Sequence, residues 1–292
     1  MSDEARILIS QHAKTSELLG VDFLPLGNGM IQAAGVVDDQ SVSAGDREDQ
    51  QARFAIQSDQ PISGSESESS VSLDSEKVPE PISSAELCDV YQTVNGDQAQ
   101  LEALSGKYVL EAPHQHFCPQ FNNIVFGEGD ASADLMFIGE APGEQEDLSG
   151  RPFVGPAGEL LSKMISAMGL SRERVYISNV LKTRPRNNAT PTSEEILLCS
   201  PYLWEQIRIV QPKVIVTLGL PASQLILGKN ETMGSMRGHW HTMSAGAVGL
   251  PEVEVMATYH PAYLLRSYTP ENRRKVWSDL TQVIEKLGLS KE

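Results

Sequence analysis

The 292-residue sequence has only three cysteines, Cys88, Cys118 and Cys199, and no two of them form a Cys-x-x-Cys pair. So small and odd a number excludes a disulfide framework and is typical of proteins from a reducing compartment. No apolar run approaches the roughly 18 residues of a membrane-spanning helix. The N-terminus, Met-Ser-Asp-Glu-Ala-Arg, lacks the basic start and apolar stretch of a signal peptide. We therefore expect a soluble, cytoplasmic protein with no membrane contact.

Basic residues are also in short supply, and the shortage is confined to one part of the chain. The formal net charge is -16, from 39 Asp and Glu against 23 Lys and Arg, which at first sight argues against a nucleic-acid partner. Residues 1–100 contain 18 of the acidic and 5 of the basic residues, which leaves 21 acidic and 18 basic residues for the remainder. The total charge therefore describes mainly the first third and does not exclude DNA binding by the rest.

The first third divides into two segments by composition. Residues 3–19 have the apolar spacing of a short amphipathic helix ended by Gly20, within an N-terminal extension that we assign to residues 1–40. Residues 41–98 are rich in Ser, Glu, Asp and Pro and poor in aromatics, so they bury too little surface to offset chain entropy. We predict a disordered acidic linker there. The extension is either a docking peptide for a protein partner or a dispensable segment.

Residues 99–292 have the alternating pattern of a folded domain. Short apolar runs typical of buried strands occupy residues 135–138, 175–177, 214–218 and 253–257. Segments of helical period lie between and after them, at 159–168, 194–210 and 272–287, and Thr192 with Glu195 has the spacing of a capping box. Strands that alternate with helices predict a three-layer α/β/α sandwich with a central, mainly parallel four-stranded sheet.

Polar side chains follow three of the expected strands. Glu140 follows the first strand, Asn179 the second and His260 the fourth. Gly139 before Glu140 permits a sharp turn, and Pro261 after His260 fixes the backbone there. The carboxyl ends of parallel strands share one edge, where ligands of such sheets bind. Each residue type is also common at solvated strand ends, so the set indicates a site more strongly than any member alone.

Five segments carry a more specific signal: in order, GEAPGEQED, RPFVGPAG, SNVLKTRPRNN, LGLPAS and YHPAYLLR. Over roughly residues 100–285 the chain resembles the family 4 uracil-DNA glycosylases. The resemblance implies an enzyme that flips deoxyuridine out of DNA, hydrolyses its N-glycosidic bond and so initiates base-excision repair. It also implies uracil-containing DNA as the partner, and we expect a monomer.

The resemblance assigns the recognition of uracil to three residues. Asn179 matches the amide that reads the adjacent O4 acceptor and N3–H donor of uracil, whereas cytosine presents the reverse polarity. Phe153 matches the aromatic ring on which the base stacks, and Gly139 lines the substrate pocket. The alternative for Phe153 is simple core packing.

The resemblance assigns catalysis to residues of the first motif and of the His-Pro motif. Glu140 matches the carboxylate that orients water and stabilises the cationic sugar, and Glu146 is the second catalytic candidate. His260 matches the histidine near uracil O2, where a donor stabilises the departing anion. The alternatives are that Glu146 and Asp147 only cap or anchor the loop, and that His260 is structural.

DNA contacts are expected around the same edge. Leu264 and Leu265, after His260, form a candidate wedge for the duplex, with Arg266 on a phosphate, although two leucines beside a strand end equally fit a core. Basic residues of the expected loops are candidate phosphate contacts: Lys182, Arg184, Arg186 and Arg237.

Family 4 members hold a 4Fe–4S cluster on four cysteines, and this chain departs from that pattern. Three ligand positions correspond to Ala112, Gln115 and Thr183, and Cys199 is the only cluster ligand retained. Threonine cannot replace a thiolate ligand. We therefore predict no cofactor, with the loop packed by Phe117, Pro119 and Phe121. The less favoured alternative is a different metal site made by His114, His116, Cys118 and Cys199.

Two alternatives to a uracil-DNA glycosylase stay open at this point. The first is a catalytically silent member of the superfamily that binds uracil or DNA. The second is a glycosylase for another deaminated base, such as hypoxanthine.

Overall fold

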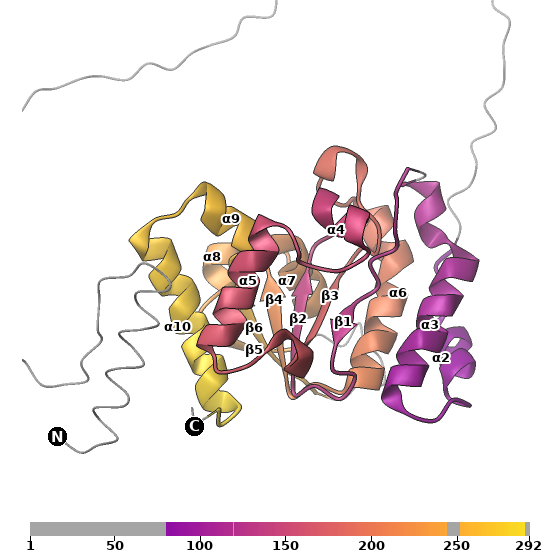
Figure 1. Ribbon diagram of the computed structural model, residues 1–292, viewed down its shortest axis with the longest axis horizontal. Coiled ribbons are helices and arrows are strands. Elements are labelled where there is room, and N and C mark those ends of the chain that lie inside the picture. Colours follow the sequence, from indigo (N-terminus) through magenta and orange to yellow (C-terminus); the bar gives the residue numbers. More distant parts are fainter. Residues whose placement is uncertain (1–79, 119, 244–251, 290–292) are drawn as a thin grey trace, which may run out of the picture. The chain divides into compact units, whose positions relative to one another are not determined.

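The computed structural model describes residues 80–118, 120–243 and 252–289, and within them one six-stranded sheet runs through the domain (Figure 1). Its strand order is β1-β3-β2-β4-β6-β5. The four inner strands are parallel, and each edge strand pairs antiparallel with its neighbour. The strands are β1 (Glu128–Gly129), β2 (Leu135–Gly139), β3 (Tyr176–Asn179), β4 (Val214–Leu218), β5 (Trp240–Thr242) and β6 (Glu254–Thr258).

Both faces of the sheet are buried, as the continuous apolar runs require. Along β2, Met136 and Ile138 belong to one core cluster, whereas Leu135 and Phe137 belong to the other. The four strands expected from the sequence are β2, β3, β4 and β6, so the three-layer α/β prediction is confirmed. The sheet has two more strands than expected, because β1 and β5 are too short to produce a recognisable pattern.

Helices cover the two faces as two separate groups. The helices α5 (Pro156–Ala167), α9 (Pro261–Arg266) and α10 (Pro270–Lys286) pack on one face. The other core cluster includes residues of α6 (Ser193–Val210), α7 (Leu220–Leu227) and α8 (Met233–Met236). The short helix α4 (Glu144–Ser149) and the 3-10 turns η1 (Pro113–His116), η2 (Arg172–Arg174) and η3 (Arg186–Asn188) lie in the connections.

Helix boundaries follow local chemistry that is visible in the sequence. The predicted capping box at the start of α6 is confirmed: the Thr192 hydroxyl accepts from the Glu195 N–H at 3.2 Å, and the Glu195 carboxylate accepts from the Thr192 N–H at 2.6 Å. Such caps stabilise a helix by about 1 kcal/mol. At the start of α5, Pro156 occupies the first turn, where its missing N–H costs nothing.

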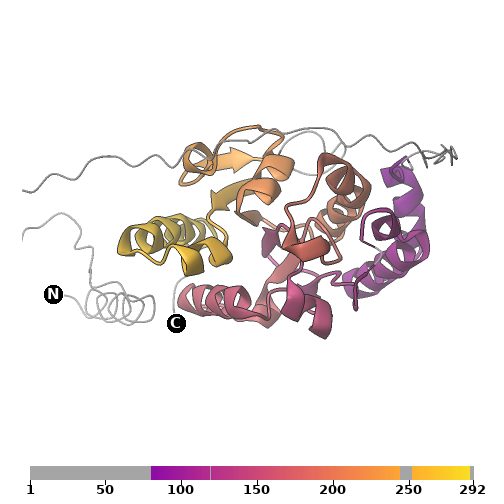
Figure 2. The ribbon, with the colours of Figure 1, turned by 90° about the horizontal axis from the view of Figure 1, so that it is seen from above.

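The folded domain begins earlier than residue 99. Helices α2 (Ser84–Tyr91) and α3 (Asp97–Glu111) pack against α6. They lie on the side of the domain away from α5 and α10 (Figures 1 and 2). Leu87 and Tyr91 of α2 are buried, and the Tyr91 hydroxyl donates to the buried Glu205 carboxylate of α6. The prediction of a linker up to residue 98 is therefore wrong for α2, because a few buried side chains outweigh a polar composition. The expected helix at 3–19 and the rest of residues 1–79 lie outside the described residues.

No helix within the described ranges is long and apolar enough to cross a membrane.

Candidate active site

The polar strand tips meet at one edge of the sheet. Gly139 at the end of β2 is in register with Asn179 at the end of β3, and Leu218 of β4 is in register with Thr258 of β6. A cavity of about 580 Å³ opens at this edge. Its lining includes Glu140, Pro142, Asn188, His260, Tyr263 and Arg266.

Glu140 is the carboxylate of this cavity. The residue follows the end of β2 directly and is half-buried. Burial raises the pKa of its carboxyl above the usual value, and the nearby Arg266 guanidinium opposes that shift. A carboxylate kept partly out of water is a stronger base and interacts more strongly with a nearby positive charge.

His260 is held as a neutral imidazole. Its Nδ1 atom accepts a hydrogen bond from the Ala262 N–H at 3.1 Å, at the start of α9, so the ring proton is on Nε2. Burial lowers the pKa of His260 to about 4, and Arg266 lowers it further, while Glu146 acts in the opposite sense. Although the residue keeps some exposure to the cavity, its ring is therefore uncharged at neutral pH and has one N–H to donate.

Asn179 and Phe153 are not part of the cavity lining, but both side chains lie next to Gly139. Asn179 is 1% exposed, and its Oδ1 atom is buried without a hydrogen-bond partner. A Cβ atom on Gly139 would lie 2.4 Å from that oxygen and 2.5 Å from Cζ of Phe153, so only glycine fits between them. The Phe153 ring also contacts His260, with ring centroids 5.5 Å apart. Unpaired buried acceptors are uncommon in folded proteins, and a bound ligand is one explanation for such an atom.

A family model described as the uracil DNA glycosylase superfamily matches residues 126–281, more than half of the chain, and this span holds every strand tip described above. The chain belongs to the uracil DNA glycosylase superfamily.

Three relatives illustrate how similar the chain is to members of this superfamily. It is 45% identical to the type-4 uracil-DNA glycosylase of Saccharolobus solfataricus over 171 residues, which are 57% of this chain and 77% of the relative. The type-4 uracil-DNA glycosylase of Thermotoga maritima is 45% identical over 54% of this chain and 80% of its own length. That of Archaeoglobus fulgidus is 43% identical over 57% and 83%.

Glu146, the second candidate acid, is an anchor for two loops. Its Oε1 atom accepts the N–H groups of Val154 and Gly155 at 2.8 and 2.9 Å, and Oε2 accepts the Gly143 N–H at 3.1 Å. Three backbone donors occupy the carboxylate, which is not part of the cavity lining. These contacts favour the loop-anchor alternative for Glu146 over the predicted catalytic role. Asp147 is also an anchor, because it accepts from the backbone and side chain of Asn122.

Two of the four expected basic contacts are internal. Lys182 is fully buried, and its ammonium group donates to Ser178 Oγ, the Asn179 carbonyl and Gln206 Oε1 at 2.6–2.8 Å. Burial lowers the pKa of Lys182 to about 7. Arg237 is mostly buried and bonded to the Asp279 carboxylate and the Lys275 carbonyl. These two side chains cannot reach a phosphate, so the predictions for them are wrong.

The other expected DNA contacts remain accessible, with one exception. Arg186 is exposed, and Arg184 is half-buried beside Asn188 and Glu144. In the wedge segment, Leu265 is 45% exposed, whereas Leu264 is 1% exposed and belongs to the core under α9. The wedge prediction is therefore wrong for Leu264, and its core alternative holds.

The residues at the cluster-ligand positions do not fit an iron–sulfur cluster. Thr183 and Cys199 are buried, Gln115 is exposed, and the second nearby thiol, Cys118, donates to the Arg184 carbonyl. Burial raises the pKa of Cys118 and raises that of Cys199 to about 11, so neither thiol is poised to be a thiolate. Among the described residues, no group of three or more His, Cys, Asp and Glu could hold a metal ion. The alternative prediction, a metal site made by His114, His116, Cys118 and Cys199, is therefore wrong.

Tyr108 of α3, which the sequence analysis did not single out, packs at this position. It is fully buried, its ring stacks on His114 at 5.3 Å and meets Tyr202 edge-on at 4.8 Å, and its hydroxyl lies 3.7 Å from Cys199 Sγ. The Thr183 hydroxyl is close to both Tyr108 and Cys118 but has no hydrogen-bond geometry to either. Of the three residues expected to fill the space, Phe121 meets His114 edge-on, Phe117 packs against the core, and Pro119 lies outside the described residues.

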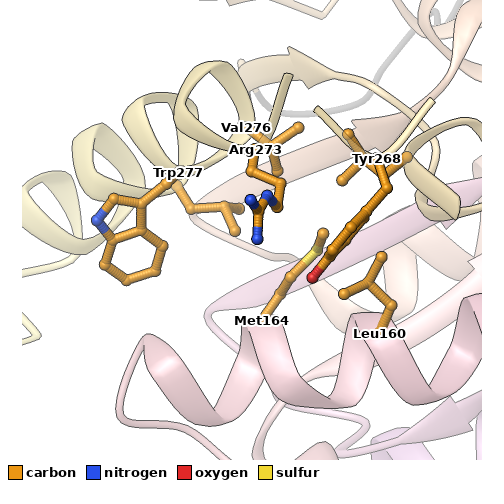
Figure 3. A pocket seen from close by; sticks show the side chains of 8 residues that line it. Leu160, Met164, Tyr268, Arg273, Val276 and Trp277 are labelled. Carbon is orange, nitrogen blue, oxygen red and sulfur yellow. The ribbon is translucent and has the colours of Figure 1, made fainter. Parts of the chain in front are cut away.

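A second cavity, between α5 and α10, is a packing gap. Figure 3 shows Leu160 and Met164 of α5 facing Tyr268, Val276 and the guanidinium of Arg273 across it. Its volume of about 10 Å³ holds at most a single water molecule. It is too small for a base or a sugar.

Proposed function

We propose that this protein is a uracil-DNA glycosylase, which hydrolyses the N-glycosidic bond of a flipped-out deoxyuridine and so initiates base-excision repair. One observation carries the proposal: the unpaired Asn179 oxygen, the Phe153 ring and the neutral His260 form a continuous row beside a cavity that holds Glu140. Membership of the superfamily and the type-4 relatives support the same activity.

Asn179 selects uracil over cytosine in this proposal. Its buried Oδ1 atom accepts the N3–H of uracil, and its amide nitrogen donates to O4. Cytosine has an acceptor at N3 and a donor at position 4, so both groups would face a like partner. Leaving buried polar groups unpaired costs about 1–3 kcal/mol each, which disfavours cytosine. Because the Phe153 and His260 rings are in contact, the base lies beside this pair and not between the rings.

Glu140 and His260 divide the charge that develops when the bond breaks. The bond between C1′ and N1 breaks, and its electron pair leaves with the base. Ionised Glu140 stabilises the positive sugar and takes a proton from the water whose oxygen bonds to C1′. The Nε2–H of neutral His260 donates to O2 of the departing uracil anion, which needs no proton transfer from an imidazolium.

Exposed residues around the cavity hold the DNA in this proposal. Arg266 and Tyr263 line the mouth, and Leu265 is exposed beside them. Arg184 precedes the segment 185–190, which contributes four residues to the cavity lining, and Arg186 lies within it. Arginine on phosphate positions the duplex without reading sequence, and an apolar side chain fills the space of the extruded base.

The proposal extends to the cofactor: the protein folds without a 4Fe–4S cluster. Support comes from Ala112, Gln115 and Thr183 at three of the four ligand positions, none of which supplies a thiolate, and from the packing of the Tyr108 ring beside Cys199. Iron and sulfide analysis of the purified protein tests this point, and stoichiometric iron would contradict it. A monomeric state, a cytoplasmic location and a protein partner for the N-terminal extension stay predictions.

Excision assays on oligonucleotides with one deoxyuridine, single- and double-stranded, test the activity. We expect uracil release by the parent protein and much slower release by Glu140→Gln and Asn179→Ala. Matched oligonucleotides with deoxycytidine or deoxyinosine test the base that is read. If the parent binds DNA but releases no more base than Glu140→Gln does, a catalytically silent member of the superfamily is favoured. Release of hypoxanthine but not uracil would favour a glycosylase for another deaminated base.

A further inference from the structure

Phe153 has a backbone conformation that a bulky residue does not adopt unaided. Its φ angle is +51°, in the left-handed region that costs a non-glycine residue about 1–3 kcal/mol. The ring is nevertheless held against Gly139 and His260. The surrounding structure must therefore impose this conformation on the 152–155 loop.

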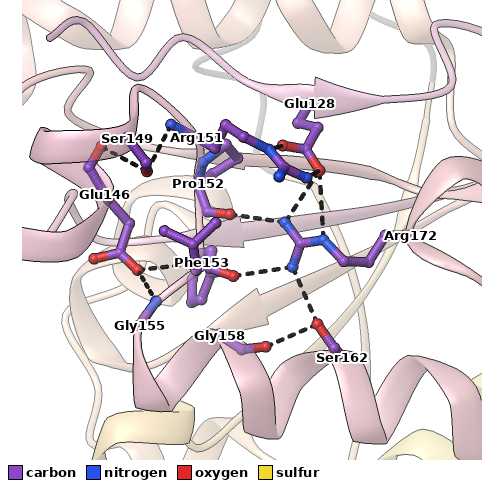
Figure 4. Close-up of polar contacts among 11 residues, drawn as sticks. Glu128, Glu146, Ser149, Arg151, Pro152, Phe153, Gly155, Gly158, Ser162 and Arg172 are labelled. Carbon is purple, nitrogen blue, oxygen red and sulfur yellow. Dashed lines mark hydrogen bonds and ion pairs between the residues drawn. The ribbon is translucent and has the colours of Figure 1, made fainter.

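Arg172 of η2 binds the two carbonyl groups on one side of this loop. Its Nη1 atom donates to the Phe153 carbonyl at 3.0 Å and its Nη2 atom to the Pro152 carbonyl at 2.7 Å (Figure 4). Nη1 also donates to Ser162 Oγ at 3.3 Å, on α5. The Glu128 carboxylate lies 3.4 Å from Arg172 and offsets its charge in a largely buried place.

Glu146 binds the other side of the loop, and Gly158 lets it approach α5. The N–H groups of Val154 and Gly155, next to Phe153, both donate to Glu146 Oε1. A Cβ atom on Gly158 would lie 1.9 Å from the Phe153 carbonyl oxygen, so the chain passes where only glycine fits. Two carbonyl groups are thus held from one direction and two N–H groups from the other, with Phe153 between them.

We propose that Arg172 is a positioning residue for base recognition, which acts by holding the Phe153 ring in place through the two carbonyl groups. This inference rests on the proposed function. The planar guanidinium holds its donors in a fixed fork that reaches both carbonyl groups, whereas a lysine ammonium is a single point charge on a flexible stem. Arg172 itself touches neither the cavity nor the expected path of the DNA, so its effect on the reaction passes through Phe153.

The test compares Arg172→Gln and Arg172→Lys with Arg151→Gln. Arg151 binds the same Glu128 carboxylate at 2.7 and 2.9 Å, but it is exposed and donates to no carbonyl of the loop. Removing either arginine removes one charge beside Glu128, so Arg151→Gln is a matched control. Because misplacing a group by about 1 Å costs on the order of 100-fold in rate, we expect single-turnover excision to fall 10- to 100-fold in both Arg172 variants. We expect unchanged DNA affinity, and parent-like activity for Arg151→Gln.

A double-mutant cycle separates positioning from general stability. In a Phe153→Ala background, Arg172→Gln should cause no further loss of rate, because the ring that it positions is gone. The inference would be overturned if Arg172→Gln lowered the rate by the same factor in the Phe153→Ala background as in the parent. It would also be overturned if the folded Arg172→Gln variant kept a rate within twofold of the parent.

Hydrogen exchange of the loop provides a readout that does not depend on activity. We expect faster exchange of the segment that contains Val154 and Gly155 in Arg172→Gln but not in Arg151→Gln. Equal exchange in the two variants would contradict the proposal that Arg172 holds this loop in place. If the parent releases uracil and only the Arg172 comparison fails, the inference fails alone. If the parent releases no base, the proposed function fails, and the role of Arg172 in base recognition fails with it.

Discussion

Buried polar atoms without a hydrogen-bond partner occur both at the strand-tip edge and on the α3–α6 side of this domain, and the two regions differ in what surrounds these atoms. The strand-tip edge holds the unpaired amide oxygen of Asn179, the backbone of Phe153 in the left-handed region and the Glu140 carboxyl with its raised pKa. On the α3–α6 side, aromatic rings pack around Cys199 where family 4 members are expected to hold a cluster. Backbone strain and a carboxyl with a perturbed pKa are typical of ligand sites, whereas a structural position can be repacked with different chemistry. We therefore expect the two regions to respond differently to mutation.

The largest effect is expected at Glu140. Glu140→Gln removes the charge that stabilises the sugar cation and should lower the excision rate by about 10²- to 10⁴-fold. Because burial raises the pKa of this carboxyl, ionising it costs folding free energy, so the variant should be at least as stable as the parent near pH 7. The parent rate should fall as the pH drops through this raised pKa, and the same acid limb should be missing from Glu140→Gln. Excision rates and thermal melts across pH check both statements, and a large loss of stability would contradict them.

Gly139→Ala should reduce excision by about 100-fold, since its Cβ would collide with Asn179 Oδ1 and the Phe153 ring and displace them. Gly106→Ala, on the exposed face of α3 with nothing within 4 Å, is the matched control. This control should leave the rate unchanged and stabilise the helix by about 0.5–1 kcal/mol. Equal rates for the two variants would show that the packing around Gly139 is unimportant for the reaction.

Tyr108→Ala sharpens the comparison from the other side. Loss of a fully buried aromatic ring should lower the free energy of unfolding by about 3–5 kcal/mol, whereas Tyr108→Phe should cost no more than about 1 kcal/mol. At temperatures well below unfolding, Tyr108→Ala should still excise uracil at close to the parent rate. Denaturant unfolding and single-turnover rates measure the two quantities. A rate loss as large as that of Glu140→Gln would show that the regions are not independent.

His260 should contribute to the dependence of stability on pH. Its pKa is lowered to about 4 in the folded state from about 6.5 when unfolded, so the stability that it contributes above pH 6.5 is lost as the pH falls toward 4. Between pH 7 and pH 4 the melting temperature should therefore fall more steeply for the parent than for His260→Gln. Identical slopes would contradict a neutral buried imidazole.

The smallest effect is expected at the rim. Arg186→Ala should weaken DNA binding by a few-fold and reduce the slope of log affinity against log salt by about one. Lys213→Ala is the control, because this exposed lysine precedes β4 and so lies at the opposite edge of the sheet. An unchanged salt slope for Arg186→Ala would remove this residue from the DNA contacts.

Much of the fold was predictable because its signals are local. Each inner strand is a continuous apolar run, and α6 begins at a capping box that four residues specify. The edge strands β1 and β5 escaped prediction because two or three half-buried residues make no pattern. Helix α2 was assigned to the linker because its buried residues, Leu87 and Tyr91, are outnumbered by polar ones.

The candidate site was predictable as a set of residues, but less so in the role of each one. Lys182 was expected to reach a phosphate, yet Gln206 of α6 and Ser178 of β3 enclose its ammonium group. Leu264 was a candidate wedge, yet it packs in the core that α5 shares with α9. Arg172 had no signal at all, because an arginine in a polar turn looks like any other surface charge.

The sequence by itself determined that an acid, an amide and an imidazole follow strands of one parallel sheet, since strand runs and turn residues are read from neighbouring positions. Only the tertiary structure decided which charges are buried, that Glu146 anchors loops and does not face the cavity, and that Arg172 reaches the carbonyl groups beside Phe153. Burial and hydrogen-bond partners depend on segments far apart in the chain, and their meeting is a property of the folded molecule alone.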